Sequence, residues 1–307
     1  MEDPVYEEEQ RMKRLAAWRC FLAVSSVLLT MASLSCDLFQ EDSPRSDPSV
    51  LIMVRIPAGS FSMGSPSENA GADESPVHIV ALDSFRISKH EIAQSLFQEL
   101  MGYNPSCFTD AGVSDDYPVE SASWFDALEF CNKISLRDGL DPVYVISSRI
   151  PATGPITSAT VVAEFEDAGG KPKSGYRLPT EAQWEYAAIG KTGSAYVWGD
   201  SNLPETAKAN AWYSVNADNS AHTAGLKRAN TWGLYDMAGN VWEWCWDWYS
   251  TYSEAAATNP RGPDSGSYRV VRGGSWSDPP SSMRAATRWF VDPCSGSKNI
   301  GFRIVAP

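Results

Sequence analysis

Residues 241–248 read VWEWCWDW, and this stretch constrains the fold more than any other part of the chain. Every second residue is Trp, with Glu243, Cys245 and Asp247 in between. Because successive side chains of a β-strand point to opposite faces, the pattern predicts a strand with one large aromatic face. Other elements have to cover that face, which favours a packed core. Alternatively, a partly exposed Trp could form the floor of a binding groove.

The composition points to a single turn-rich domain with modest regular secondary structure. The 307 residues include 12 Trp, 22 Gly and 20 Pro, and 43% are hydrophobic, enough to bury a substantial core. No fixed-period repeat and no clear linker divides residues 51–307, so one large domain is expected there. The net charge of −13 argues against general nucleic-acid binding, which depends on Lys and Arg meeting phosphates.

An export signal is predicted at the N-terminus. An apolar stretch at residues 15–34 follows several basic residues and ends in Ser-Leu-Ser before Cys36, which resembles the signal of bacterial lipoproteins. Residues 1–35 are therefore predicted to be a signal peptide. Met12 is the better start, because the residues before it are acidic where positive charge is expected. Plain secretion and a retained membrane anchor are the alternatives.

If Cys36 carries a lipid, the protein is expected to be exported and anchored to a bacterial membrane, with the cell surface as the expected location and the membrane face left open. Residues 36–50 are polar and rich in Pro and Ser, which is typical of a flexible tether. Export permits disulfides, but a large domain does not need them, so no bridge is predicted and the pairing is left open. No CxxC or other metal-binding spacing occurs either. The cysteines concerned are Cys107, Cys131, Cys245 and Cys294.

Local patterns predict several elements of the domain. Strands are expected at residues 51–64, interrupted at 57–59, and at 77–87, and helices at 91–100, 123–138 and 180–190. Ser123 with Asp126, and Thr180 with Gln183, have the spacing of capping boxes. Cys131 falls on the apolar face of the second helix and is expected to be a small core residue. Residues 163–176 and 252–267 are expected to be surface loops.

A series of short motifs occurs in order along the chain. They are IPAG and MG at 56–64, PVE and SW at 118–124, YRLPTE and WEYA at 176–187, GLYDM and GNVWEW at 233–244, RGGSW at 272–276, RAA at 284–286 and GFR at 301–303. Over residues 52–305 the chain resembles the formylglycine-generating enzyme (sulfatase-modifying factor) family. This resemblance implies a single α+β domain with a C-type-lectin-like fold of the formylglycine-generating enzyme type and little regular secondary structure.

The resemblance does not extend to the family's catalytic groups. The family's oxidase needs two cysteines, spaced Cys-x4-Cys, that bind copper after the Gly-Gly-Ser-aromatic turn. Asp278 and Met283 occupy these positions here. A second branch uses three His to hold iron, whereas His78, His90 and His222 are isolated in this sequence. The chain is therefore predicted not to be an enzyme and to need neither copper nor iron. A metal-dependent oxidoreductase is the least favoured alternative.

One metal site of the family has matching residues. The family binds calcium in the loop that reads GLYDMAGNVWEW here, and the matching positions are Asp236, Gly239, Val241 and Glu243. Carboxylate and carbonyl oxygens are the ligands that calcium prefers. The resemblance thus implies a structural calcium ion. The alternative is that Asp236 and Glu243 only form hydrogen bonds with the backbone.

The C-terminal segment also resembles the variable proteins of diversity-generating retroelements, such as the Treponema variable lipoprotein. In that group a fixed frame alternates with exposed positions that are rewritten by mutagenic reverse transcription. The frame here would be residues 269–276, 284–286, 288, 293 and 301–305, and the rewritten positions would be 277–282, 287, 290–292 and 294–297. Asparagine codons randomised at adenine cannot give Trp, Met or Lys, so Met283, Trp289 and Lys298 are expected to be fixed.

These considerations predict a surface lipoprotein with a ligand-binding domain, which binds a protein or another cell-surface ligand through its C-terminal segment. Aromatic and short polar side chains suit such a surface. The expected ligand-binding residues are Ser277, Asp278, Ser281, Ser282, Thr287, Phe290, Val291, Asp292 and Ser295. A generic accessory or structural lipoprotein of the same family is the alternative. A monomer is expected, with no nucleic-acid partner.

Overall fold

The computed structural model describes residues 50–67, 70–109, 116–200 and 204–307. The predicted signal peptide, Cys36 and nearly all of the tether lie outside these ranges, so those predictions stay predictions. Within the described part of the chain, no helix combines the length and the apolar character that a membrane span needs.

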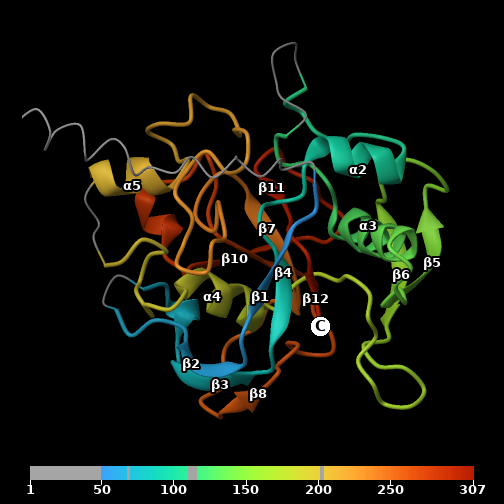
Figure 1. Cartoon of the computed structure of the whole chain (residues 1–307), viewed down its shortest axis with the longest axis horizontal. Coiled ribbons are helices and arrows are strands. Elements are labelled where there is room, and N and C mark those ends of the chain that lie inside the picture. The colour runs from blue at the N-terminus through green and yellow to red at the C-terminus, as the bar shows by residue number, and fades with distance from the viewer. Residues whose placement is uncertain (1–49, 68–69, 110–115, 201–203) are drawn as a thin grey trace, which may run out of the picture. The chain divides into compact units, whose positions relative to one another are not determined.

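The largest sheet is built from the C-terminal third of the chain (Figure 1). Its strand order is β10-β9-β7-β11, and β10 is therefore an edge strand. Strand β9 is antiparallel to β7 and to β10, whereas β11 is parallel to β7. The bounds are β7 (Trp242–Trp248), β9 (Arg269–Arg272), β10 (Arg288–Val291) and β11 (Ile300–Gly301).

The remaining strands of the described residues form three smaller sheets. The strand at residues 77–87 that we expected is in fact two strands, because the chain turns at Asp83-Ser84 and each half joins a different sheet. The first sheet joins β1 (Met53–Ile56), β4 (Phe85–Ser88) and β12 (Val305–Ala306), the second joins β2 (Gly59–Met63), β3 (His78–Leu82) and β8 (Ala257–Thr258), and the third joins β5 (Tyr144–Ile150) and β6 (Ser158–Ala163).

Two of the expected helices begin where their capping signals predict, whereas the helix expected at 91–100 begins only at Gln94, after Ala93, which provides no side-chain cap. Ser123 accepts a hydrogen bond from the Asp126 amide and Thr180 accepts one from the Gln183 amide, and each is reciprocated, so both capping boxes are confirmed. The helix α5 and the β5–β6 hairpin were not expected. The helices are α2 (Gln94–Met101), α3 (Trp124–Arg137), α4 (Glu181–Ile189) and α5 (Pro204–Asn210), and 3-10 turns occur at Ala72–Glu74 and Pro280–Met283.

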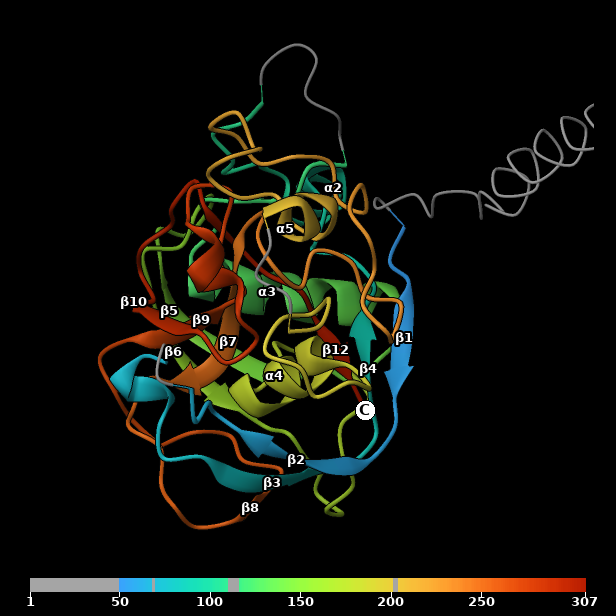
Figure 2. The ribbon, with the colours of Figure 1, turned by 90° about the vertical axis from the view of Figure 1, so that its left-hand side faces the viewer.

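The Trp-rich strand β7, which lies beside β9 in Figure 2, contributes residues to two hydrophobic clusters. Trp242 and Trp244 belong to the cluster that contains α3, whereas Cys245 belongs to the cluster that contains α4. The aromatic face is therefore core, as the alternation predicts. The opposite face is buried as well, because α4 covers it: the Trp184 indole of α4 donates a 2.6 Å hydrogen bond to Glu243.

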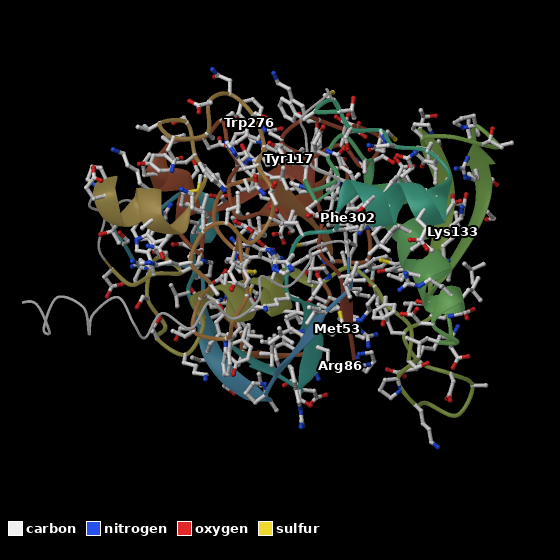
Figure 3. The ribbon with its side chains drawn as sticks, turned by 45° about the horizontal axis from the view of Figure 1, so that its top comes forward. Met53, Arg86, Tyr117, Lys133, Trp276 and Phe302 are labelled. Carbon is white, nitrogen blue, oxygen red and sulfur yellow. The ribbon has the colours of Figure 1, made fainter. Side chains whose placement is uncertain are left out.

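Aromatic side chains fill both the centre and the upper end of the domain (Figure 3). Phe302 is fully buried in the α3 cluster. Trp276 forms a third, small cluster with Val241, against which Tyr117 and Phe108 pack. Since Trp276 directly precedes the expected ligand-binding segment, this cluster fixes the point from which that segment departs.

Candidate functional site

A groove of about 690 Å³ runs along the C-terminal segment, and we call it the C-terminal groove. One wall comes from the turn at residues 278–287 and another from the edge strand β10. Residues 71–74, far away in the sequence, form part of the rim. The volume falls in the range of small-molecule pockets, and the groove opens to solvent, which also suits a segment of a protein ligand.

Five of the nine expected ligand-binding residues line this groove, and four do not. Those in the groove are Asp278, Ser281, Ser282, Thr287 and Val291. All nine are at least partly exposed, as a binding surface requires. The four that lie elsewhere are Ser277, Phe290, Asp292 and Ser295.

The edge strand β10 explains why Phe290 is not in the groove. Trp289 and Val291 line the groove, and side chains alternate along a strand. Phe290 therefore turns the other way and packs against Tyr249 and Tyr268, with ring centroids 4.6 and 5.1 Å apart. The expectation that Phe290 and Val291 share one surface is thus not met by the geometry.

Trp289 is the groove residue that sequence reasoning missed. It was excluded from the diversified set on codon grounds, yet its side chain is 56% exposed and lines the groove. Trp combines a large apolar area with few rotatable bonds, which makes it effective in binding surfaces. Its position two residues before Val291 was the signal that could have identified it, because the two residues share a strand face.

Most of the frame around these positions is buried and held by ion pairs, whereas Arg284 and Ala286 are partly exposed. Residues 269–276 and 301–305 are buried throughout. Arg272 pairs with Glu185, Arg288 pairs with Glu181 at 2.7 Å, and Arg303 pairs with Glu243 at 2.6 Å, all with nearly inaccessible side chains; the Arg272 and Arg303 pairs are among the most deeply buried.

Gly296 lies among the positions expected to vary, but the structure restricts it. A Cβ atom on Gly296 would lie 1.9 Å from the Ser121 carbonyl oxygen, which is far inside van der Waals contact. The Ser121 amide also donates to the Ser297 carbonyl at 3.0 Å. This loop is therefore pinned to the segment before α3, and only Gly fits at position 296.

The positions of the family's two cysteines carry different chemistry here. Asp278 accepts a 2.9 Å hydrogen bond from the Trp242 indole and another from the Ser275 hydroxyl. Met283 is buried and packs against Gly274. A carboxylate that is held by an indole and a hydroxyl, together with a buried thioether at the second position, cannot provide the two thiolates that copper(I) prefers.

The cysteines and histidines that the structure describes lie apart from one another. Cys107, Cys131, Cys245 and Cys294 are all free, and Cys131 is completely buried on α3, as predicted. Burial lowers the pKa of His90 to about 4. His222 stacks on Trp212 with ring centroids 3.8 Å apart, and His78 contacts Tyr252. In the described ranges, no group of three or more His, Cys, Asp or Glu side chains is arranged to hold a metal ion.

The residues expected to hold calcium are already engaged. Glu243 accepts hydrogen bonds from Arg303 at 2.6 and 2.7 Å and from Trp184 at 2.6 Å. Asp236 Oδ2 accepts from the Gly225 amide at 2.7 Å, whereas its Oδ1 is buried without a partner. Because Arg303 neutralises Glu243, the set does not fit a calcium ion while that ion pair stays closed.

The loop that contains Asp236 is held by backbone contacts and by a neighbouring acid. The Gly239 amide donates to Gly273 and the Val241 amide donates to Glu91, at 2.9 and 3.2 Å. Burial raises the pKa of Asp236 to about 6 and the pKa of Glu91 well above its usual value. Three observations still favour the calcium prediction: Asp236 Oδ1 has no partner, and the pKa values of Asp236 and Glu91 are both raised.

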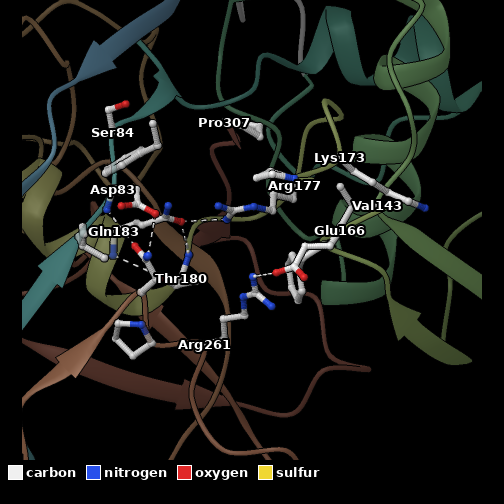
Figure 4. A pocket seen from close by; sticks show the side chains of 16 residues that line it. Asp83, Ser84, Val143, Glu166, Lys173, Arg177, Thr180, Gln183, Arg261 and Pro307 are labelled. Atoms are coloured by element: carbon white, nitrogen blue, oxygen red, sulfur yellow. Dashed lines mark hydrogen bonds and ion pairs between the residues drawn. The ribbon is translucent and has the colours of Figure 1, made fainter. Parts of the chain in front are cut away.

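Two further cavities contain none of the nine expected residues. A pocket of about 220 Å³ lies around Arg177, near Pro307 (Figure 4). Arg177 donates to Gln183 at 2.8 Å there, and Arg261 approaches Glu166 at 3.6 Å. A wider cavity of about 850 Å³ lies beside α4. Among the cavities described so far, the C-terminal groove is thus the one that coincides with the predicted surface.

Comparisons with known proteins give consistent matches over most of the chain. The chaperone protein LppX of Paenibacillus barcinonensis is 32% identical over 278 residues, which cover 84% of this chain and 88% of that protein. The formylglycine-generating enzyme of Streptomyces coelicolor is 35% identical over 289 residues, which cover 86% and 92%. The structure of Treponema denticola variable protein 1 has a TM-score of 0.73 and 33% identity, and the match covers 83% and 94%.

These findings confirm the predicted fold class, an α+β, C-type-lectin-like fold of the formylglycine-generating enzyme type, and the predicted likeness to a variable protein. The relatives include a protein that is named as an enzyme and one that is named as a variable protein. A family model described as the sulfatase-modifying factor enzyme 1-like domain matches residues 39–307. The chain therefore belongs to the sulfatase-modifying factor (formylglycine-generating enzyme) family.

Proposed function

We propose that this protein is a non-enzymatic member of its family that binds a protein ligand through the C-terminal groove. One observation carries the proposal: within a single segment, buried and ion-paired frame residues alternate with exposed residues, and five of the nine expected ligand-binding residues line the groove. A surface built this way tolerates new side chains without losing its fold. The likeness to Treponema denticola variable protein 1 supports the same reading.

Two matched libraries test this proposal directly. The first randomises the groove residues Ser281, Ser282, Thr287 and Val291, and the second randomises four frame residues, Arg272, Ser275, Arg288 and Arg303. Both are displayed on yeast and scored for protease resistance, then selected for binding to hen lysozyme as the protein probe. We expect the first library to stay folded and to yield binders, and the second to unfold. Equal loss of folding in both libraries would contradict the proposal.

Diversification by a retroelement is a separate part of the proposal, and the DNA around the gene tests it. A near-identical repeat of the coding sequence for residues 269–305, differing at adenines and lying next to a reverse transcriptase gene, is the expected finding. Codons 283, 289 and 298 should then match the repeat. If no such repeat accompanies the gene, the diversified reading is wrong, and a fixed ligand-binding surface remains.

The proposed lack of enzyme activity rests on the chemistry of the two positions that match the family's cysteines. Asp278 and Met283 supply one carboxylate and one thioether, and the carboxylate is engaged by Trp242 and Ser275. Assay of the purified protein with a sulfatase-derived cysteine peptide and copper should give no aldehyde. Stoichiometric copper or iron in the purified protein, together with turnover, would overturn this part of the proposal.

An accessory role is the second candidate, and one relative favours it. The LppX protein is named as a chaperone and matches this chain over most of both lengths. An accessory protein would bind one partner through a fixed surface, so its gene would lack the template repeat. The same DNA survey therefore separates the two candidates.

Surface anchoring through a lipid on Cys36, and a monomeric state, complete the proposal. Mass spectrometry of the mature N-terminus should show a lipidated residue 36. An unmodified peptide that spans residues 34–37 would exclude this anchor. Sedimentation equilibrium of the detergent-free soluble domain measures its oligomeric state.

A calcium ion at Asp236 stays a prediction. To bind that ion, Glu243 would have to give up its ion pair with Arg303. Thermal melts with calcium and with EGTA test it. A stabilisation by calcium that the Asp236→Asn variant loses would support the ion. An unchanged midpoint in both solutions removes it.

A further inference from the structure

A fourth cavity, of about 360 Å³, lies between strands β7 and β8 and the loop at residues 250–263, and we call it the β8 pocket. Its walls are mostly apolar and include Met63, Ala182, Trp248 and Ala257. Arg288 is the one described residue that lines both this pocket and the C-terminal groove. The β8 pocket is therefore a separate candidate site, and its volume suits a small organic molecule.

Asp247 provides a carboxyl group in the β8 pocket. The residue is only 5% exposed, and its Oδ2 accepts a 2.9 Å hydrogen bond from the Glu181 amide. Its Oδ1 accepts no hydrogen bond from any residue that the structure describes, and this oxygen keeps some accessible surface. A buried carboxyl oxygen with no protein partner that faces a cavity is an unfilled acceptor site.

The loop above Asp247 leaves this oxygen uncovered. Gly262 has a φ of 72°, and a Cβ atom there would lie 2.8 Å from the Asp247 Cβ and 3.1 Å from its Oδ1. Any other residue at position 262 would be strained and would press on the carboxyl group. Gly262 thus lets the loop approach while the acceptor stays open.

The other charged groups of the β8 pocket already have partners. Glu181 accepts hydrogen bonds from Arg288 at 2.7 and 2.8 Å and from the Tyr252 hydroxyl at 3.1 Å. Arg261 approaches Glu166 at 3.6 Å. With these charges neutralised, Asp247 determines which charge the pocket prefers in a ligand.

We propose that the β8 pocket binds a small organic amine, whose ammonium group pairs with Asp247 Oδ1 and whose apolar part packs on the Trp248 and Met63 side. An ammonium ion donates charge-assisted hydrogen bonds and compensates the desolvated carboxylate, which a neutral ligand cannot do. The apolar walls favour a ligand with a hydrocarbon or aromatic body. The proposal is independent of the ligand of the C-terminal groove.

The electrostatics of Asp247 agree with this assignment. Burial, and then the negative charge of Glu181, raise the pKa of Asp247 to about 7, while Arg269 and Arg288 act in the opposite direction. His78 and Arg261 are the other titratable groups that line the pocket. A bound ammonium group stabilises the ionised form of Asp247, so the affinity should increase as the pH rises from about 6 to about 8.

The experiment uses benzylammonium as the probe and benzyl alcohol as its uncharged isostere. Each is titrated into the ¹⁵N-labelled protein, and the indole N–H signals of Trp248 and Trp289 report on the pocket and on the groove. We expect benzylammonium to shift the Trp248 signal saturably, and benzyl alcohol to bind at least about tenfold more weakly. The Trp289 signal should not move.

Three variants separate charge from shape. Asp247→Asn keeps the shape and should weaken benzylammonium about tenfold or more and abolish its pH dependence, whereas Asp141→Asn, an exposed control, should change nothing. Ala255→Phe narrows the pocket from its exposed rim without touching Asp247, and should weaken both probes. Equal affinities of the two probes, or an unchanged affinity in Asp247→Asn, would overturn the proposal.

Discussion

The frame residues and the groove residues share one segment of the chain, but they are held in different ways. Arg272, Arg288 and Arg303 are buried, and each pairs with a carboxylate from a distant part of the sequence. Ser281 and Trp289, only a few residues away, are exposed and line the C-terminal groove. This fold therefore fixes its C-terminal segment at intervals by buried charge pairs, and most of the intervening surface lacks such pairs.

Breaking one buried pair should have the largest effect on stability. In Arg303→Met the carboxylate of Glu243 stays buried without its cation, and removal of one partner from such a pair costs about 3–5 kcal/mol. Urea unfolding measures the change. The exposed control Lys298→Met should stay within about 0.5 kcal/mol of the wild type.

A double variant sharpens this test. Glu243→Gln in the Arg303→Met background removes the unpaired charge and should recover part of the loss, because the desolvated carboxylate is the main cost. If the single variant lost less than about 1 kcal/mol, the frame would not depend on buried charge, and the contrast with the groove would fail.

The pH dependence of stability should come from the buried acids. The pKa of Asp247 is raised to about 7 in the folded protein and is about 4 in the unfolded chain, so the folded state binds the extra proton between these values. The stability from this group is thus complete below pH 4 and declines toward pH 7, with a slope of up to about 1.4 kcal/mol per pH unit.

A comparison of wild type with Asp247→Asn isolates this slope. His90, whose pKa is lowered to about 4, acts in the opposite direction between pH 4 and 6.5 and is present in both proteins. When the unfolding free energies are measured from pH 4 to 8, the stability of the variant relative to the wild type should therefore increase as the pH rises. Parallel curves would mean that Asp247 titrates alike in both states.

Gly296 is an exception to the contrast between a buried, fixed frame and an exposed, variable surface, because it is exposed and yet constrained. Gly296→Ala places a methyl group against the Ser121 carbonyl and should cost about 1–3 kcal/mol, the usual range for overpacking. Its exposed neighbour Ser295 offers the matched change, Ser295→Ala, which should be close to neutral. Similar effects of the two substitutions, measured by urea unfolding, would contradict the constraint on position 296.

The sequence predicts features whose cause is local. The capping boxes at Ser123 and Thr180 and the Trp alternation of β7 each contain their signal within a few residues, and the structure confirms them. Capping and alternation are properties of neighbouring backbone groups, so no partner has to be known. The exposure of the groove residues follows in the same way from their position between frame motifs.

Features that depend on distant partners were missed. Which face of β10 carries Phe290 depends on its pairing with β9 and on Tyr249 and Tyr268 beyond it. The clash at Gly296 comes from Ser121, which is 175 residues earlier in the numbering. Long-range packing decides such details, and a single sequence does not contain the pairing that would reveal them.

The smallest effect on stability is expected at the groove position Ser281, whose side chain forms no hydrogen bond with another described residue. Ser281 is exposed, and its side chain forms none of the hydrogen bonds found between described residues, although its carbonyl accepts a weak bond from Thr287 at 3.5 Å. Ser281→Tyr should therefore change the free energy of unfolding by no more than about 0.5 kcal/mol. The frame residue Ser275, fully buried and bonded to Asp278, is the matched position for Ser275→Tyr, which should be strongly destabilising. A loss above about 2 kcal/mol at Ser281 would show that the groove surface is part of the scaffold after all, and would leave no surface free to vary.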